Sequence, residues 1–277
     1  MVNMKNYPVE EQNQITKVLI KTDLVDVKIS QDNHLSWSME HHCLMKSSLD
    51  QSLLVFDIES KEERHAEFKL NLPDELEEIR IETVSGDISI KEIKTDHFML
   101  SSKSGDVKVK ETKGLLWVKT LSGDIDVENC IADELVLNSS SGDIDVEINE
   151  SKVVSIKSTS GEIEVDLSNA VSCVVNSTSG DIEFDGSAEH LVVKSKSGDV
   201  EVNCFEPKEI QIETQSGDVE MSVKACSGLE GVVQTNSGKI ELDLEEAVFV
   251  SSALTWKDAS AKIMLKTESG DISLFEE

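Results

Sequence analysis

The stretch Ser141-Gly142-Asp143-Ile144-Asp145-Val146 is one copy of a turn-and-strand unit that the chain repeats ten times. The first eight Ser-Gly pairs recur at an almost constant interval, and the last two intervals are longer. Eight pairs continue as Ser-Gly-Asp, while Glu162 and Lys239 replace the aspartate in the other two. A fixed period of about 20 residues is typical of a solenoid, in which each coil buries its apolar face against its neighbours. The ten glycines, called the repeat glycines below, are Gly86, Gly105, Gly123, Gly142, Gly161, Gly180, Gly198, Gly217, Gly238 and Gly270.

Apolar and polar residues alternate on both sides of the repeat glycines. Ile144 and Val146 stand two and four residues after Gly142, and Leu137 stands five before it; the other units match. Such alternation predicts strands with one buried face. Identical turns at constant spacing favour coils that stack in parallel, about 4.8 Å apart, each on the last, over an antiparallel meander. We therefore predict an all-β, single-stranded β-solenoid of about nine coils with about 18–19 residues per coil, capped by N-terminal β-strands.

A hydroxyl residue stands three positions before every repeat glycine, as Ser139 does before Gly142. Alternation predicts that this residue points inward, and that the serine directly before the glycine, here Ser141, points the same way. We expect the glycine to supply a positive φ at a sharp corner, and the following Asp to bond the turn backbone. A catalytic serine is the alternative reading, but ten equivalent serines without a partnered histidine indicate a requirement of the fold.

The repeats and their flanks predict three segments. Residues 1–14 are expected to be a flexible N-terminus, and residues 15–78 an N-terminal β cap continuous with the solenoid. Residues 79–277 are expected to form the solenoid repeats, with atypical C-terminal coils. The insertion at 243–262 is interpreted as a cap, because exposed solenoid ends need cover; a binding site there is the alternative.

The formal net charge of −29 restricts the classes of partner that the chain can bind. Such a chain repels phosphate backbones and anionic membranes, so nucleic acid is excluded as a general partner. Divalent cations are possible but unspecific partners. Five cysteines without a CxxC pair suit a reducing compartment, and no signal peptide or apolar run long enough to span a membrane is evident. These features predict a cytoplasmic protein, with association to the cell envelope through a partner as the alternative.

Carboxylates that follow the repeat glycines raise the question of a metal. Stacked like charges repel, and a calcium ion would relieve that repulsion. Calcium-binding β-rolls use a turn with more glycines, however, and Lys239 interrupts the series. We predict no specific metal site and no cofactor, and we keep a calcium ladder as the alternative. Its ligands would be Asp106, Asp124, Asp143, Asp181, Asp199 and Asp218.

The sequence raises two further chemistries, a zinc site and polysaccharide cleavage. A zinc site would need convergent ligands from His34, His41, His42, Cys43 and His65 of the N-terminal flank, where packed or exposed histidines are the simpler interpretation. Polysaccharide cleavage would use paired carboxylates, but any acidic solenoid supplies these, and an anionic sugar would meet a negative surface. We predict no catalytic residues and no enzyme activity.

The segment from Phe68 to Ile88, with Leu72-Pro73 shortly before the first Ser-Gly-Asp turn, resembles the bacterial "putative adhesin" or toast-rack β-strand-repeat family. The resemblance covers roughly residues 15–277. It implies a β-solenoid with no established catalytic activity, and many members of the family are tied to the bacterial envelope and its stress responses. It offers no agreed functional residues.

The sequence therefore predicts a non-catalytic, adhesin-like scaffold or binding module for an unidentified protein or surface partner. One alternative, which rests on the resemblance, is a component of an envelope stress response or of sensing. A second alternative is a carbohydrate-active enzyme built on a β-helix.

Overall fold

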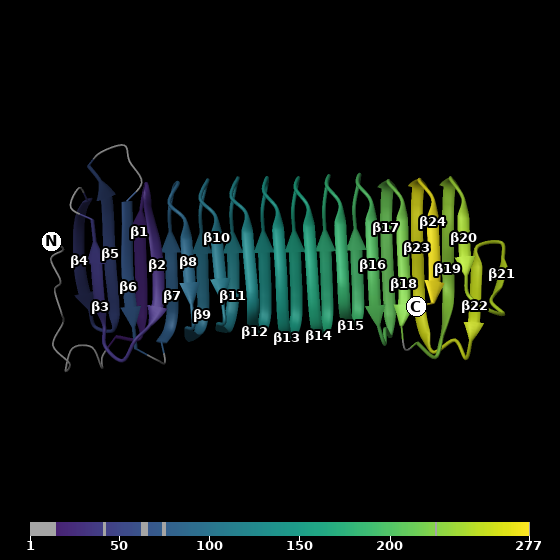
Figure 1. The fold of residues 1–277 in the computed structure, drawn as a ribbon, viewed down its shortest axis with the longest axis horizontal. Helices are drawn as coiled ribbons and strands as arrows, with labels where there is room; N and C mark the ends of the chain where they lie inside the picture. Colours follow the sequence, from purple (N-terminus) through teal and green to yellow (C-terminus); the bar gives the residue numbers. More distant parts are fainter. Residues whose placement is uncertain (1–14, 41–42, 62–65, 74–75, 225, 277) are drawn as a thin grey trace. The chain divides into compact units, whose positions relative to one another are not determined.

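The computed structural model describes residues 15–40, 43–61, 66–73, 76–224 and 226–276, and every regular element in them is a β-strand (Figure 1). The chain divides into two units, Met1–Gly142 and Asp143–Glu277. Within the part of the chain that the structure describes, no helix has the length and apolar character needed to cross a bilayer.

Unit 1 winds its strands into coils whose neighbours pair in parallel. One row of strands has the order β5–β1–β7–β9–β11–β12, and the other has the order β6–β2–β8–β10–β12. The long strand β12 belongs to both rows. The strands are β1 (Lys17–Thr22), β2 (Val25–Gln31), β3 (Ser36–Met39), β4 (Cys43–Asp50), β5 (Leu53–Ser60), β6 (Ala66–Leu72), β7 (Leu76–Glu82), β8 (Ile88–Lys91), β9 (Lys94–Ser101), β10 (Val107–Lys110), β11 (Lys113–Lys119) and β12 (Ile125–Asn138).

Unit 2 continues the same pattern with longer strands. Strands β13, β14 and β15 pair along their whole length, and after β15 the strands again form two rows. These rows have the orders β16–β18–β24–β20 and β17–β23–β19–β22–β21. The strands are β13 (Ile144–Lys157), β14 (Ile163–Asn176), β15 (Ile182–Lys194), β16 (Val200–Phe205), β17 (Glu209–Ser216), β18 (Val219–Lys224), β19 (Gly228–Ser237), β20 (Ile240–Asp243), β21 (Val248–Val250), β22 (Ala253–Lys257), β23 (Ala261–Ser269) and β24 (Ile272–Glu276).

Equivalent residues of successive coils lie side by side. In unit 1, Val107 pairs with Ile88 on one side and with Ile125 on the other, and each stands two residues after its repeat glycine. All three side chains are almost fully buried. Parallel pairing in register confirms the predicted all-β solenoid and excludes the antiparallel meander, because a meander would not bring equivalent residues together.

The stacking order differs from the prediction that each coil lies on the one before it. Strands β23 and β24, the last in sequence, lie between β17–β18 and the earlier pair β19–β20 (Figure 1). In unit 1, β1 and β2 likewise lie between β5–β6 and β7–β8. The coils β1–β2 and β23–β24 are therefore paired on both edges. The coils next to them toward each end of the stack, β5–β6 and β19–β20, lie nearer the middle of the sequence than β1–β2 and β23–β24 do.

The hydroxyl residues three positions before the repeat glycines point inward as predicted; nine of the ten are buried and Thr235 is half-buried. The serines directly before the glycines do not: each of the ten is exposed or half-buried, which corrects the prediction. The inward–outward alternation of the strand ends at the bend, because there the backbone turns and hydrogen-bonds the backbone of the adjacent coil. The N–H of Ser104, for example, donates to the carbonyl of Val84 at 3.0 Å.

Stacking explains the repeat glycines better than the predicted backbone conformation does. Six of the ten have a positive φ, whereas Gly86, Gly105, Gly123 and Gly238 do not. A Cβ on Gly105 would nevertheless lie only 2.1 Å from the carbonyl oxygen of Gly86 in the adjacent coil. The corner therefore requires glycine chiefly because adjacent backbones approach too closely for a side chain.

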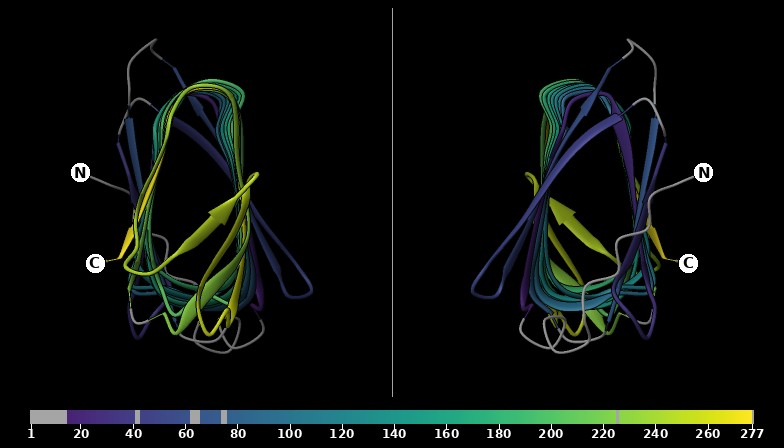
Figure 2. Two further views of the ribbon diagram at one scale, coloured as in Figure 1. Left: turned by 90° about the vertical axis from the view of Figure 1, so that its right-hand side faces the viewer. Right: turned by 90° about the vertical axis from the view of Figure 1, so that its left-hand side faces the viewer.

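Antiparallel strands cover parts of the stack. In unit 1, β3 pairs with β6 and β4 pairs with β5. In unit 2, β22 covers the edge of β19, and the hairpin β21–β22 lies across the end of the coils (Figure 2). Leu254 of β22 is opposite Gly231 and is buried, so it supplies apolar bulk where Gly231 interrupts the repeat pattern. The insertion at 243–262 thus acts as a cap.

Candidate functional site

The aspartates after the repeat glycines bond the backbone of the adjacent coil. In unit 1, Oδ1 of Asp87 accepts the N–H of Asp106 at 2.9 Å, and Oδ1 of Asp106 accepts that of Asp124 at 2.9 Å. In unit 2, Asp143 accepts the N–H of Glu162, and the series Asp181, Asp199, Asp218, Asp271 and Lys239 is linked in the same way, at 2.7 to 2.8 Å. These carboxylates hold the turns together.

Lys239 fits this arrangement because it only has to donate its N–H. Its coil contains β20, whose strand partner in the described residues is β24 alone, so no further coil requires a carboxylate from it. Five of the six candidate calcium ligands are therefore engaged with backbone amides, namely Asp106, Asp143, Asp181, Asp199 and Asp218. Among the described residues, no group of three or more His, Cys, Asp or Glu side chains is placed to hold a metal ion.

The candidate zinc ligands are not brought together in what the structure describes. His34 is exposed and Cys43 is buried. His41, His42 and His65 lie outside the described residues, so the structure does not test their part of the cluster.

The inward hydroxyls serve the turns as well. The hydroxyl of Ser158 donates to the carbonyl of Ser160 at 2.9 Å, and Oγ of Ser102 accepts the N–H of Gly105 at 2.8 Å. Burial raises the pKa of the Cys130 thiol and that of Cys204, the latter to about 11. Hydroxyls engaged with the turn backbone and thiols with raised pKa values are poor nucleophiles.

Unit 2 presents a row of carboxylates three residues after its repeat glycines. Glu164, Glu183 and Glu201 are directly adjacent on β14, β15 and β16. Desolvation, followed by the charges of Glu201 and Glu164, raises the pKa of Glu183. In unit 1 the matching surface is neutralised instead, since Lys108 pairs with Asp126 and Lys110 pairs with Glu128. These lysines lower the pKa of Glu128 to about 2.

Glu183→Gln is expected to stabilise the protein at pH 7 by about 0.2 to 0.5 kcal/mol, the usual cost of like charges that face each other on a sheet. The raised pKa means that the fold favours the protonated carboxyl, so ionisation opposes folding as the pH rises through that pKa. The gain should vanish below about pH 4, where the carboxyl is protonated in both states. Urea unfolding at pH 4 and pH 7 measures it.

Glu213→Gln is the matched control, and it is expected to destabilise the protein at pH 7, where Glu183→Gln stabilises it. Lys194 lowers the pKa of Glu213, so the stability that this carboxylate contributes is present above about pH 4.3 and is lost as the pH falls through the lowered pKa. A stabilising effect of Glu213→Gln at pH 7, or none from Glu183→Gln, would contradict the assignment.

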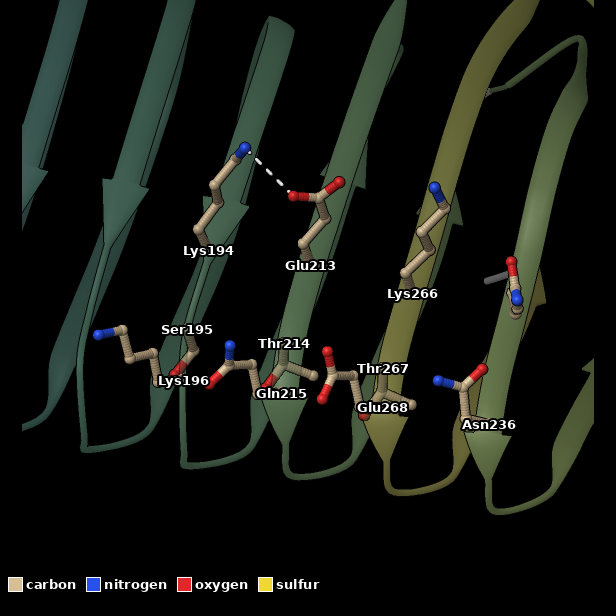
Figure 3. A pocket seen from close by; sticks show the side chains of 11 residues that line it. Lys194, Ser195, Lys196, Glu213, Thr214, Gln215, Asn236, Lys266, Thr267 and Glu268 are labelled. Atoms are coloured by element: carbon tan, nitrogen blue, oxygen red, sulfur yellow. Dashed lines mark ion pairs between the residues drawn. The ribbon is translucent and has the colours of Figure 1, made fainter.

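A polar groove of about 400 Å³ lies on the outer side of β15, β17, β23 and β19 (Figure 3). Lys194, Glu213, Lys266 and Gln234 cross it on adjacent strands, and Lys194 Nζ lies 3.2 Å from Glu213 Oε2. The charges alternate and largely neutralise one another. The groove has no apolar side chain among its lining residues, so it offers little driving force for binding a partner.

A different surface in unit 1 combines an exposed aromatic ring with apolar neighbours. Met99, Trp117 and Val136 lie directly beside one another on β9, β11 and β12 and point outward. Trp117 is 48% exposed. These three residues are called the Trp117 surface below. They contribute to the lining of a groove of about 280 Å³.

Polar side chains border the Trp117 surface. Two residues further along the same strands, Ser101, Lys119 and Asn138 form a parallel row that also lines the groove. At one end Arg80 lies beside Met99, and its guanidinium bonds Glu82 with Nη2 2.7 Å from Oε1. An apolar centre with a polar rim is the usual anatomy of a protein interface, and Trp, Met and Arg are enriched in such places.

The repeats of this chain are those of a known family. The model of the family described as Toastrack DUF4097 matches residues 9–147 and 110–274. The chain belongs to the Toastrack DUF4097 family. This Toastrack chain has no significantly similar curated protein.

Solved structures give more distant likenesses to the Toastrack chain. A "putative lipid binding protein" from Parabacteroides distasonis ATCC 8503 is 15% identical, with 99% of this chain and 96% of that chain covered and a TM-score of 0.44. A "putative adhesin" from Parabacteroides merdae ATCC 43184 is 11% identical, with 100% and 95% covered and a TM-score of 0.38. Another, from Bacteroides fragilis NCTC 9343, is 12% identical, with 100% and 97% covered and a TM-score of 0.34. These values are too low to transfer a ligand or a role.

Sequence reasoning missed the Trp117 surface because it concentrated on the turn. The signal was present six residues before the repeat glycines, an outward position of the strand. Aligned on the glycines, that position reads Arg80, Met99, Trp117 and Val136 in four consecutive units. Only the in-register pairing shows that these residues form one continuous surface.

Proposed function

We propose that this Toastrack chain is a non-catalytic scaffold that binds a protein partner through the Trp117 surface. The observation that carries the proposal is the half-exposed indole of Trp117 between Met99 and Val136, in a chain whose outward strand positions are mostly polar. A solvated tryptophan in the middle of an apolar row gains free energy when a partner covers it.

The backbone beneath the Trp117 surface is held in place before any partner binds, which supports the same function. Trp117 lies on a central strand that is paired on both edges, with β9 on one side and β12 on the other. Its neighbours Leu116 and Val118 are buried, so the backbone beneath the indole is held by the core. A surface that is ordered before binding loses less conformational entropy when a partner docks. Interface energy commonly concentrates in one such aromatic residue within a polar rim.

Trp117→Ser is expected to weaken capture of the partner at least tenfold without altering the fold, because the indole contributes to binding and not to the core. The measurement compares proteins cross-linked to the wild-type chain, Trp117→Ser and Val171→Ser in lysate of the native organism. Val171 is the matched control, since it is an exposed apolar residue on a strand of unit 2. A partner retained by Trp117→Ser, or lost equally from Val171→Ser, would contradict the proposal.

Fluorescence gives a direct readout at the same residue. The chain has three tryptophans, and Trp37 and Trp256 are buried, so acrylamide quenching of the native protein reports mainly on Trp117. Binding of a captured partner is expected to reduce that quenching, because the indole becomes covered. Cell fractionation of the same partner tests the envelope role, which a purely cytosolic complex would exclude.

A further inference from the structure

One side of the Trp117 surface is bordered by polar side chains that the protein itself does not use. Ser101, Lys119 and Asn138 lie directly beside one another on β9, β11 and β12, and they are called the Lys119 row below. Among the residues that the structure describes, no hydrogen bond or ion pair engages any of these three side chains. A hydroxyl, an ammonium and an amide all supply hydrogen-bond donors, and the ammonium carries the only charge. The row is therefore available to an acceptor from outside the chain.

The carboxylate at the end of the Lys119 row is already held by other cations. Glu82 on β7 lies beside Ser101. Its Oε1 accepts a hydrogen bond from Nε of Arg80 at 2.8 Å and lies 2.7 Å from Nη2 of the same guanidinium. Lys21 Nζ lies 3.5 Å from its Oε2. Glu82 is thus engaged on both oxygens and is not left over to neutralise Lys119.

Comparable lysines elsewhere are neutralised by the adjacent coil. On the other row of unit 1, Lys108 and Lys110 pair with carboxylates of β12. In unit 2, Lys194 occupies the same repeat position as Lys119, and its Nζ lies 3.2 Å from Oε2 of Glu213 on the next coil. Lys119 has an uncharged residue on each side instead. Its counter-charge therefore has to come from a partner.

The local charge around the row favours an anion in a chain that is otherwise acidic. Residues 91–119, which contain β9, β10 and β11, hold seven lysines and four acidic residues, a net charge of +3 against −29 for the whole chain. On the opposite side of the Trp117 surface, Glu134 stands two residues before Val136 on β12. A carboxylate of the partner is therefore attracted at Lys119 and repelled at Glu134.

A partner that covers Trp117 also removes water from Lys119. The two residues share the outer face of β11 and are separated by about 6.6 Å along the strand. A partner without an acceptor at this place would leave the ammonium partly desolvated and uncompensated, which costs binding free energy. A carboxylate replaces the lost water with short, charge-assisted hydrogen bonds.

We infer that the partner of the Trp117 surface binds through an acidic segment, in which an aspartate or glutamate stands two residues from an apolar anchor in an extended conformation. The inference rests on the proposed function, whose partner it specifies. The anchor covers Trp117, and the carboxylate binds Lys119 with Ser101 and Asn138. Side chains two residues apart in an extended segment share one face and have the spacing of Trp117 and Lys119. The terminal carboxylate of a peptide lies closer to its own side chain, so an internal acidic residue is the better fit.

Peptide selection tests this chemistry without a known partner. The probes are random peptides of about twelve residues whose C-terminus is fused to a phage coat protein, so that their carboxylates are side chains. They are selected on the full chain and screened against Trp117→Ser. Peptides that require Trp117 are expected to be enriched in Asp or Glu two positions from an aromatic or aliphatic residue. Trp117-dependent peptides without this enrichment would overturn the acidic segment and leave the proposed function standing, whereas an absence of Trp117-dependent peptides would overturn both.

Charge reversal at Lys119 tests the contact itself, with a selected peptide as the probe. Lys119→Glu is expected to weaken binding about tenfold, and Lys119→Met about three- to fivefold, because the first adds repulsion to the loss of the ion pair. Lys239→Glu is the control, since it makes the same change of net charge at an exposed turn of unit 2 where most repeats carry an acidic residue. It should change the affinity by less than about twofold. Equal weakening by Lys239→Glu, or none by Lys119→Glu, would overturn the contact.

Salt and the end of the peptide give two further readouts. The wild type should lose its advantage over Lys119→Met as NaCl rises from about 50 to about 500 mM, because salt screens the ion pair. A synthetic peptide should bind equally well with a free and with an amidated C-terminus. An advantage of the wild type that persists in high salt would contradict the ion pair, and loss of binding on amidation would assign the carboxylate to the chain end and overturn the internal acidic residue.

Discussion

Gly217→Ala is expected to lower the free energy of unfolding by about 2 to 5 kcal/mol. Two effects combine at this position. A Cβ would lie 2.1 Å from the carbonyl oxygen of Gly198 in the adjacent coil, and overpacking of this kind costs about 1 to 3 kcal/mol. The φ of Gly217 is 133°, and an L-residue there adds about 1 to 2 kcal/mol of backbone strain. Urea denaturation followed by circular dichroism measures the loss.

Two companion variants separate stacking from strain. Gly105→Ala tests stacking alone, because its Cβ would lie equally close to Gly86 while its φ is not positive. Gly105→Ala should lower the free energy of unfolding by less than Gly217→Ala does, but still by more than about 1 kcal/mol. Ser216→Ala is the control, since this serine is exposed and precedes the same glycine; it should change stability by less than about 0.5 kcal/mol. Equal effects of Ser216→Ala and Gly217→Ala would show that the corner is not sterically restricted.

Deletion of residues 259–277 is expected to unfold the whole C-terminal end of unit 2 and not merely to shorten it. The deletion removes β23 and β24, which lie between β17–β18 and β19–β20. It also removes the buried side chains of Ile263, Leu265, Ile272 and Leu274. Each buried side chain of this kind contributes roughly 1.5 to 3 kcal/mol, so their sum rivals the stability of a typical domain.

Hydrogen exchange resolves this prediction by segment. Residues 228–257 should lose their protection in the truncated chain, because β19 and β20 no longer have a parallel neighbour. Strands β13 and β14 should keep theirs, since coils interact mainly with their nearest neighbours. A truncated chain that retains protection in 228–257 would show that β19 and β20 can pair with β17 and β18 directly.

Local features of the fold were predictable because each depends on residues near one another in sequence. The alternation around Gly105 predicts a strand on either side, and the buried residues Val107 and Val109 follow it. The serines before the glycines were misplaced because alternation cannot describe a bend. The role of Asp106 was half predicted: it bonds a turn backbone, but the amide belongs to Asp124 of the next coil.

The candidate site was much less accessible from sequence. Trp117 reads as one more strand residue, and its environment depends on Met99 and Val136, which lie one repeat before it and one repeat after it in the chain. Lys119 likewise reads as one more polar strand residue, and only the pairing shows that Ser101 and Asn138 lie on either side of it.

The amino-acid sequence by itself determined the coil: its period, its inward and outward faces, and the need for a small residue at each corner. These follow from steric and hydrophobic preferences that act within a single repeat. Only the tertiary structure decided which coils are neighbours, since identical turns make any two coils compatible in pairing. The placement of β23 and β24 inside the stack, the continuity of the Trp117 surface and the uncharged side chains on either side of Lys119 all depend on that choice of neighbours.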